Sequence, residues 1–458
     1  MIPCRPYITS LTTVRIFLLL GTVFGMIWSV VTPPFQAPDE DIHFCRAYQL
    51  ADGDLLPLTA GGTQGGCLPL SVIETITRVN PGLRYHSRDQ RQDPGRILHY
   101  LQRPLEPGKT RFFAFPSGAF YPPAAYLPHV AAIWTGRLIG CSPLVMMYLG
   151  RWFTLLLWLL LVRAAIKITP TGRWIFMAVA LMPMSLFIGA SFNQDAVTNG
   201  LAFFTLAWLL DLSRKPGLLT RGQLALFALL VAAFALAKPG FALFALLFFL
   251  LPRAKARSQR AYLATGGLLL AAGYAAGLVW YNLAGSDLNW NAPFAGYEAQ
   301  VAALLDNPLL FIRALLRSLW SYKFFYLRSH LGQLGSLDVV LPLHVLLPVL
   351  ATLAVTACFN KGLLLAARQK AVLALVFLGL LVQAFLALYL TASPVAGPYC
   401  HGFQGRYLIS VAPMFWLLWQ NRLQGLGRRW RELAGPALFV LYLVVLSLAT
   451  RVLFLRYY

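Results

Sequence analysis

The stretch Thr32-Pro33-Pro34-Phe35-Gln36-Ala37-Pro38-Asp39-Glu40-Asp41-Ile42-His43 directly follows the first long apolar run of the chain, Leu11–Val31. Its prolines fix φ and lack an N–H donor, so the helix predicted for that run ends here. Three consecutive carboxylates and a histidine therefore stand on a stiff backbone at a membrane surface. Acidic groups at such a boundary are costly and mark a candidate functional site. The alternative is a solvated turn in which Asp39 or Asp41 caps the next helix.

Composition identifies the class of protein to which this boundary belongs. The chain has 458 residues, of which 58% are hydrophobic and 12% charged, and soluble chains are about 25% charged. Many of its apolar runs approach the roughly 20 residues that cross a bilayer as a helix. We therefore predict an all-α polytopic membrane protein in which residues 1–458 form a single membrane domain. The net charge of +22 does not indicate nucleic-acid binding, because the basic residues form short clusters between apolar runs, as in cytoplasmic loops.

Those basic clusters set the predicted topology. The positive-inside rule places all of them on the inner side of the membrane. The five clusters begin at Arg163, Arg214, Arg253, Lys361 and Arg422. This arrangement predicts about 11 transmembrane helices, with the N-terminus inside and the C-terminus outside. Residues 11–31 are the first span, residues 33–120 a large outer loop, and residues 121–455 the remaining spans and interfacial helices.

The positions of the later elements follow from the same alternation. We predict an interfacial or re-entrant helix at 121–140, because residue 120 is outside and residue 163 inside. The second span is expected at 144–162. The others are expected at 174–190, 196–212, 222–237, 241–252, 261–282, 339–358, 371–391, 406–420 and 434–455.

The outer loop at 33–120 carries nine of the sixteen acidic residues of the chain and an equal number of Lys and Arg. We interpret this loop as a small cap over the acidic motif. It is expected to contain a short helix at Asp41–Leu50 and a flexible turn at Gly61–Gly66. Cys45 and Cys67 both lie in this loop, in a disulfide-permissive compartment, and are the expected disulfide pair.

Two charged residues on the outer side are further candidates. Asp195 is a lone acid between two predicted spans, and it is either the cap of the next helix or part of a site. Lys238 lies in a break between two apolar segments that are too short to cross the bilayer. A lysine at that depth needs an anion or a water-filled cavity, unless its side chain snorkels to the surface.

Two outer segments contain the remaining candidates. Apolar residues recur at helical spacing over Tyr297–Arg328, which predicts an amphipathic interfacial helix broken near Pro308. Arg313 and Arg317 of this helix suit an anionic lipid headgroup or act as snorkelling anchors. The segment Gly397–Tyr407 holds Arg406, a residue type that grips phosphate through two parallel hydrogen bonds. The alternative is that Arg406 anchors a helix end.

Several of these motifs together resemble a known family. They are Pro33–Glu40 with His43, Tyr121-Pro122-Pro123, Ser191–Asp195 and Gly405-Arg406-Tyr407. The chain is similar to a bacterial polytopic membrane family of unassigned function, domain-of-unknown-function family 2142, which resembles the GT-C superfamily of membrane glycosyltransferases. The resemblance implies a GT-C-like fold in the bacterial inner membrane, with an active site on the periplasmic side. It also implies a polyprenyl-phosphate-sugar donor and a catalytic acid at the end of the first span.

We therefore expect a glycosyltransferase that acts on an envelope glycan or glycolipid acceptor. Either Asp39 or Glu40 is the expected general base. The donor phosphate is expected to bind to cationic side chains, namely Arg406, Lys238, Arg313 and Arg317. Substrate positioning is expected from Asp195, Asp41, His43, Tyr407 and His401. No metal or cofactor is expected, because Arg and Lys can take the charge of the leaving phosphate.

Two other function classes use the same basic groups. A transporter or flippase of lipid-linked sugars would bind the phosphate without needing a base. A non-catalytic assembly factor for envelope polysaccharide would need neither a base nor a transport path. The sequence shows no membrane-buried acid pair and no two halves of similar pattern, and both features are common in transporters.

Overall fold

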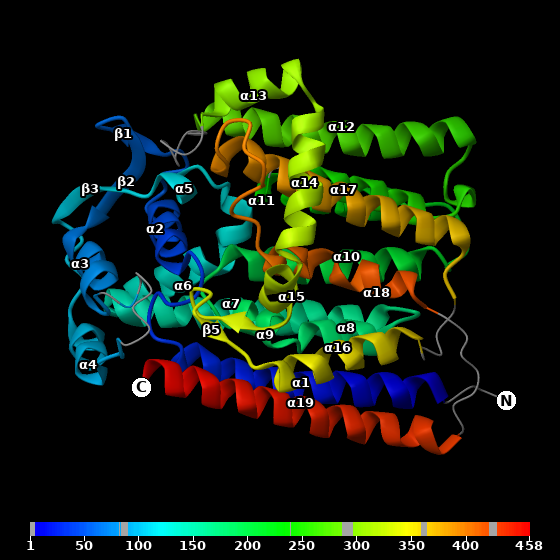
Figure 1. The fold of residues 1–458 in the computed structure, drawn as a ribbon, viewed down its shortest axis with the longest axis horizontal. Helices are drawn as coiled ribbons and strands as arrows, with labels where there is room; N and C mark the ends of the chain where they lie inside the picture. Colours follow the sequence, from blue (N-terminus) through cyan, green and yellow to red (C-terminus); the bar gives the residue numbers. More distant parts are fainter. Residues whose placement is uncertain are drawn as a thin grey trace.

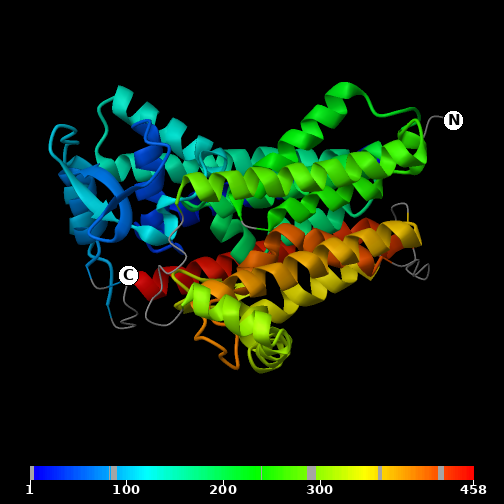
Figure 2. The same ribbon diagram turned by 90° about the horizontal axis from the view of Figure 1, so that it is seen from above.

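The long helices of the molecule run roughly parallel to its longest axis (Figure 1). The structure is a computed structural model that describes residues 5–81, 83, 90–238, 240–285, 296–358, 364–420 and 428–458. Short helices and strands gather at one end of the bundle, beside the C-terminus, and the N-terminus lies at the other end (Figures 1 and 2). The inner clusters predicted at Lys361 and Arg422 begin outside the described residues.

Several helices are candidates for membrane spans. Among the described residues, five are long and apolar enough to cross a membrane. They are Thr12–Val31 of α1 (Arg5–Val31), α7 (Pro143–Ile168), α12 (Gln259–Leu283), α17 (Ala367–Ala392) and Ala434–Tyr457 of α19 (Arg428–Tyr457). A sixth candidate is the bent pair formed by α13 (Tyr297–Asp306) and α14 (Leu309–Ser321). The chain is thus mostly helical with five or six candidate spans, and the number eleven stays a prediction.

The other predicted spans fall on shorter or less apolar helices. These are α8 (Arg173–Ala180), α9 (Pro183–Gly189), α10 (Gln194–Leu212), α11 (Arg221–Ala237), η3 (Phe241–Leu250), α16 (Leu343–Cys358), η5 (Gly405–Val411) and α18 (Ala412–Leu418). Pro183 separates α8 from α9, because proline cannot donate the hydrogen bond that would continue the helix. Gly240 separates α11 from η3 with φ of 93°, a conformation that favours glycine. Its neighbour Pro239 lies outside the described residues.

Two predicted interfacial segments are helical in the structure. The segment predicted at 121–140 forms η2 (Pro123–Tyr126) and the 12-residue α6 (Leu127–Leu138), which is too short to cross a bilayer. The chain bends by 107° between α13 and α14, so the predicted break near Pro308 is confirmed. In Figure 1, α14 runs crosswise to α17. It is followed by α15 (Lys323–Leu331) and a short antiparallel pair, β4 (Gln333–Leu334) and β5 (Val339–Val340).

The cap, residues 33–120, contains a three-stranded antiparallel sheet that the all-α prediction missed. Its strands are β1 (Leu58–Ala60), β2 (Thr63–Pro69) and β3 (Thr110–Ala114), in that order. Gly61 and Gly62 have φ of 59° and 76°, the two positive values that a tight hairpin turn between β1 and β2 requires. The predicted flexible turn is therefore shorter than expected, because Gly65 and Gly66 already pair with β3.

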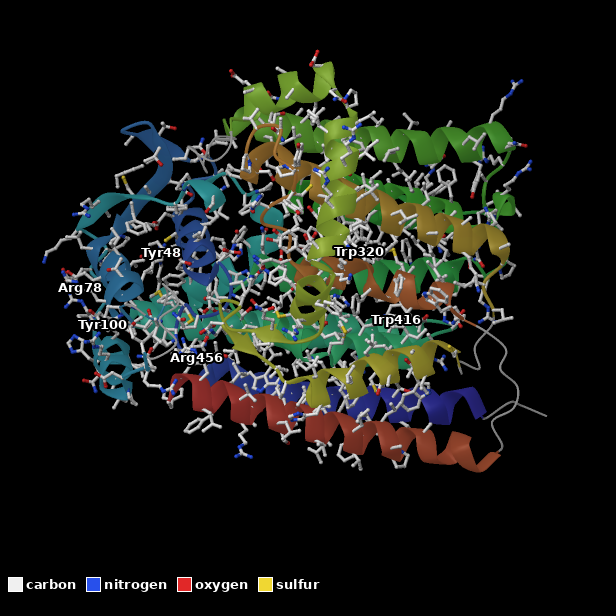
Figure 3. All side chains as sticks on the ribbon, in the orientation of Figure 1. Tyr48, Arg78, Tyr100, Trp320, Trp416 and Arg456 are labelled. Carbon is white, nitrogen blue, oxygen red and sulfur yellow. The ribbon has the colours of Figure 1, made fainter. Side chains whose placement is uncertain are left out.

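The described residues of the cap also form four helices, which connect it to the bundle. They are α2 (Glu40–Ala51), α3 (Leu70–Arg78), α4 (Pro94–Gln102) and α5 (Pro116–Ala119), so the helix expected at 41–50 is confirmed. Figure 3 shows Tyr48, Arg78 and Tyr100 in the cap and Arg456 at the near end of α19; Trp320 and Trp416 lie over the bundle. Arg456 pairs with Asp338 at 2.8 Å. The Gln92 amide donates to the Tyr457 carbonyl at 2.7 Å, which fixes the end of α19 against the cap.

The two cysteines of the cap are not bonded to each other. Cys45 and Cys67 are both free thiols, so the predicted disulfide is absent from the structure. Cys45 is buried in the apolar interior of the cap, on α2. Cys67 is an exposed residue of β2, between two buried neighbours. The two thiols differ in exposure because α2 packs on the inner side of the sheet, whereas Cys67 projects from its outer side.

Candidate functional site

The proline-rich turn after α1 is held by side chains from distant parts of the chain. Proline has no N–H, so carbonyl oxygens of this segment are left as acceptors. Arg151, from α7, donates to two of them and to one carbonyl in the last turn of α1, all at 2.7–2.9 Å, and Asn193 donates to the Pro38 carbonyl at 2.9 Å. The acceptors of Arg151 are the carbonyls of Ser29, Thr32 and Pro33. Asn80 and Ser336 bond to the carbonyls of Pro34 and Gln36.

This turn ends at Asp39 in a backbone conformation that is uncommon for aspartate. Asp39 precedes α2 with φ of 59° and ψ of 15°, in the left-handed region. Its side chain makes no capping hydrogen bond to the helix, so the simple cap alternative does not apply. The carboxylate instead accepts a hydrogen bond from Arg406 at 2.7 Å. A non-glycine residue in this region costs about 1–3 kcal/mol and persists only where its surroundings enforce it.

Arg406 connects Asp39 to a second ion pair. Its Nη1 lies 3.7 Å from the carboxylate of Asp195, and Lys238 Nζ lies 2.7 Å from the other oxygen of that carboxylate. Lys238 and Arg406 also lie 4.9 and 5.1 Å from the centre of the Tyr407 ring, within cation–π distance. The structure thus brings five predicted residues into one cluster from four separate segments. We call Asp39, Asp195, Lys238, Arg406 and Tyr407 the charged cluster.

The exposure of the cluster is uneven. The side chain of Asp39 is 53% exposed, whereas the side chain of Arg406 is only 3% exposed. Asp195 and Lys238 lie between these limits, at 10% and 21%. Arg406 and Asp195 are therefore buried, Lys238 is partly buried, and Asp39 is the carboxylate that a ligand approaching from the surface meets first.

His43 borders the charged cluster, one helical turn after Asp39. Its Nδ1 lies 2.7 Å from the hydroxyl of Tyr126. Burial lowers the pKa of His43 to about 4, although the nearby carboxylates of Asp39 and Asp195 act in the opposite direction. Burial raises the pKa of Asp39, but Arg406 and His43 outweigh burial and hold that pKa below its ordinary value of 3.8. At neutral pH, Asp39 is therefore ionised and His43 is neutral.

Glu40, predicted with Asp39 as a possible base, lies in a different environment. Both side chains of the Glu40–Arg151 pair are fully buried. Arg151 donates to the two carboxylate oxygens at 2.7 and 2.6 Å, and the Phe192 amide donates to one of them at 2.8 Å. No ligand can approach Glu40 without breaking this pair. Its position fits a structural role, in which it anchors the start of α2 to α7.

The sequence-based reasoning overlooked Arg151. All five N–H groups of its guanidinium donate hydrogen bonds, so it joins α1, the proline-rich turn, α2 and α7. A signal was present in the sequence, because Arg151 is a single charge within the apolar run predicted as the second span. Ionisable residues inside such runs are rare and have a partner.

The other predicted site residues are placed as follows. Asp195 is in the first turn of α10, whose cap is Asn193, since Asn193 accepts from the Asp195 amide at 2.8 Å. Asp41 is buried in the first turn of α2. Three residues predicted to bind or position substrate lie on exposed surface, and no described contact joins them to the charged cluster. They are Arg313 and Arg317 on α14 and His401 before η5. Among the described residues, no His, Cys, Asp or Glu group is arranged to hold a metal ion.

Comparison with known proteins identifies the family. No curated protein and no solved structure matches the chain. The family described as "Predicted membrane protein (DUF2142)" matches residues 22–415, which is most of the chain and includes the whole charged cluster. The apolar helices of the fold agree with that description. The chain therefore belongs to the family of predicted membrane proteins DUF2142.

Proposed function

We propose that this protein is a GT-C-type glycosyltransferase that moves a sugar from a polyprenyl-phosphate carrier to an envelope glycan or glycolipid, such as O-antigen. The site would lie on the periplasmic side of the bacterial inner membrane. The observation that carries the proposal is the convergence of one exposed carboxylate, Asp39, with two cations, the buried Arg406 and the partly buried Lys238. The sequence motifs are similar to those of a family that resembles the GT-C superfamily, and this likeness supports the reaction class.

The cations of the cluster suit a phosphate leaving group. Arg406 is held in place by Gln404, whose side-chain oxygen accepts from its Nε at 2.6 Å. Its other two nitrogens face Asp195 and Asp39. A donor phosphate that enters the cluster would share these N–H groups, which match phosphate geometry. The phosphate would partly neutralise the charge of Arg406. This change would weaken the ion pair between Arg406 and Asp39 and make the Asp39 carboxylate a stronger base.

The proposed reaction is a displacement at the anomeric carbon of the donor sugar. The acceptor hydroxyl attacks this carbon, and Asp39 takes the hydroxyl proton as the new C–O bond forms. The bond between the anomeric carbon and the phosphate oxygen breaks, and polyprenyl phosphate leaves with the electron pair. Arg406 and Lys238 stabilise the charge that develops on this phosphate. Glu40 has no part in the chemistry and holds the backbone that presents Asp39.

The test is sugar transfer by purified protein supplied with polyprenyl-phosphate sugars and candidate acceptors. Asp39→Asn keeps the size of the side chain but removes the base. Transfer should fall by roughly 10²–10⁴-fold, while donor binding is kept. Asp306→Asn, an identical change of an exposed carboxylate on α13, is the matched control and should transfer normally.

Two outcomes would overturn this proposal. Transfer by Asp39→Asn at the rate of the Asp306→Asn control would remove Asp39 from the chemistry. Donor binding by the wild-type protein without transfer to any acceptor would favour a carrier of lipid-linked sugars, the transporter or flippase class.

A further inference from the structure

We infer that Tyr121 and Tyr281 form a subsite for the sugar ring of the donor, next to the charged cluster. The inference rests on the proposed function and adds a recognition element for the group that is transferred. The subsite comes from two elements, the segment between α5 and η2 and the last turn of α12. Neither residue bears a charge, and sequence reasoning assigned no role to either side chain.

Aromatic rings lie next to both Tyr121 and Tyr281. The Phe120 ring lies 5.1 Å from the ring of Tyr121 and 5.9 Å from the ring of Tyr281, measured between centroids. Tyr121 also lies 6.2 Å from the ring of His43, which borders the charged cluster. Ligand sites combine such apolar walls with a few polar groups that fix orientation. A sugar has the matching surfaces, because the face of its ring carries C–H groups and its edge carries hydroxyls.

The hydroxyl of Tyr281 is the observation that points to a ligand. Its oxygen is buried, and the described residues offer it no hydrogen-bond partner. Most buried polar side-chain atoms in native proteins are paired, and leaving one unpaired is unfavourable by 1–3 kcal/mol. A sugar hydroxyl would supply the missing partner.

The surroundings hold both tyrosines in place. Trp280, next to Tyr281 on α12, donates its Nε1 hydrogen bond to the Phe120 carbonyl at 2.8 Å. Arg46 of the cap donates its Nε hydrogen bond to the Tyr121 carbonyl at 2.8 Å. These two bonds tie the end of α12 and the cap to the same short segment. The spacing between the two rings is thereby set before any ligand arrives, and such preorganisation favours binding.

Tyr121 lies near both the aromatic ring of Phe120 and the charged side chains of Asp39 and Asp195. Burial raises its pKa well above 10, and Tyr281, Asp39, Asp195 and Tyr407 raise it further, in that order. The phenol therefore stays protonated and can donate to a sugar oxygen. Because Asp39 and Asp195 are near enough to act on Tyr121, a donor whose phosphate binds to Arg406 would place its sugar next to this phenol.

The experiment compares the binding of sugar-free polyprenyl phosphate with that of polyprenyl phosphates carrying a hexose, an N-acetylhexosamine or a pentose. In the wild-type protein, at least one sugar should increase the affinity over the sugar-free lipid. Tyr281→Phe should reduce this increment by roughly two- to tenfold, the size of one neutral hydrogen bond. Affinity for the sugar-free lipid should not change, and the thermal stability of the empty protein should not fall.

Tyr274→Phe is the matched control on the same helix. Its hydroxyl bonds to Gln383 at 3.3 Å on the exposed side of α12, so its loss should not affect the sugar increment. Tyr121→Phe should act like Tyr281→Phe. The inference would be overturned if the sugar still increased the affinity as much in both Tyr121→Phe and Tyr281→Phe as in the wild-type protein. Equal loss of affinity for the sugar-free and the sugar-bearing lipid would overturn it as well. Absence of transfer in the wild-type protein, with the increment intact, would overturn the proposed function alone.

Discussion

Asp39 and Glu40 are neighbours in the chain, and each pairs with an arginine, yet their two ion pairs differ completely in exposure. The Glu40–Arg151 pair is fully buried and has every polar group bonded. The Asp39–Arg406 pair has a buried arginine and a carboxylate that is 53% exposed. The difference arises because Asp39 has a left-handed backbone and Glu40 begins α2, so their side chains leave in different directions.

This difference separates two uses of the same chemistry. Removing one partner of a buried, fully bonded pair leaves a charge without compensation, so such a pair acts as a fixed anchor. An ion pair open to solvent contributes little to stability, and its carboxylate can exchange partners. The anchor therefore positions the turn, and the open pair remains available to a ligand.

The largest expected effect is loss of the anchor. Arg151→Met should destabilise the protein by about 3–5 kcal/mol, because it strands the buried carboxylate of Glu40 and frees three backbone carbonyls. The measurement is denaturant unfolding in detergent micelles. In the double variant with Glu40→Gln, the free energy of unfolding should fall by less than the sum of the decreases in the two single variants, since no buried charge remains. Additive losses would mean that the pair is not coupled.

The pH dependence of stability comes next in size. The pKa of His43 is lowered from 6.5 to about 4 by burial, so the unfolded chain takes up a proton first as the pH falls. Stability should be fully present above pH 6.5 and decline by roughly 3 kcal/mol on the way to pH 4. His43→Gln should reduce the loss of stability between pH 6.5 and pH 4. His99→Gln, on the exposed surface of α4, is the control and should leave it unchanged.

The third effect concerns donor binding. Arg406→Ala should weaken binding of the polyprenyl-phosphate donor by roughly 10- to 100-fold, because a charged hydrogen bond contributes about 1.5–3 kcal/mol. Arg406→Lys should restore only part of the affinity, since lysine lacks the planar fork. Arg313→Ala, on the exposed face of α14, tests the alternative phosphate position. Equal weakening by Arg313→Ala and Arg406→Ala would place the donor elsewhere.

The smallest effect should be that of Asp39→Asn on stability. The pair with Arg406 is half open to solvent, so its loss should change the free energy of unfolding by no more than about 1 kcal/mol. Asparagine also tolerates the left-handed conformation of this position. Asp39→Ala should be more destabilising, because alanine does not. If Asp39→Asn lowered the free energy of unfolding as much as Arg151→Met, the two ion pairs would not differ in their contribution to stability.

Part of the fold and of the candidate site was predictable from the sequence. Composition and apolar runs establish a membrane protein, because the bilayer requires long apolar helices whatever their packing. The prolines at 33, 34 and 38 end the first helix through a local backbone effect. The residues of the charged cluster were identifiable one by one, as polar or charged side chains beside apolar runs. The interfacial break at Pro308 was likewise a local property.

Only the tertiary structure decided how these parts combine. Asp39 and Arg406 are separated by 367 positions in the sequence, and no periodicity brings such residues together. The different exposure of Asp39 and Glu40 depends on where Arg151 lies, and the free state of Cys45 depends on the packing of α2. The sheet of the cap arises from pairing between β2 and β3, which lie about 40 residues apart. Residue types and local backbone limits are written in the sequence, whereas exposure and partner choice are settled by long-range packing.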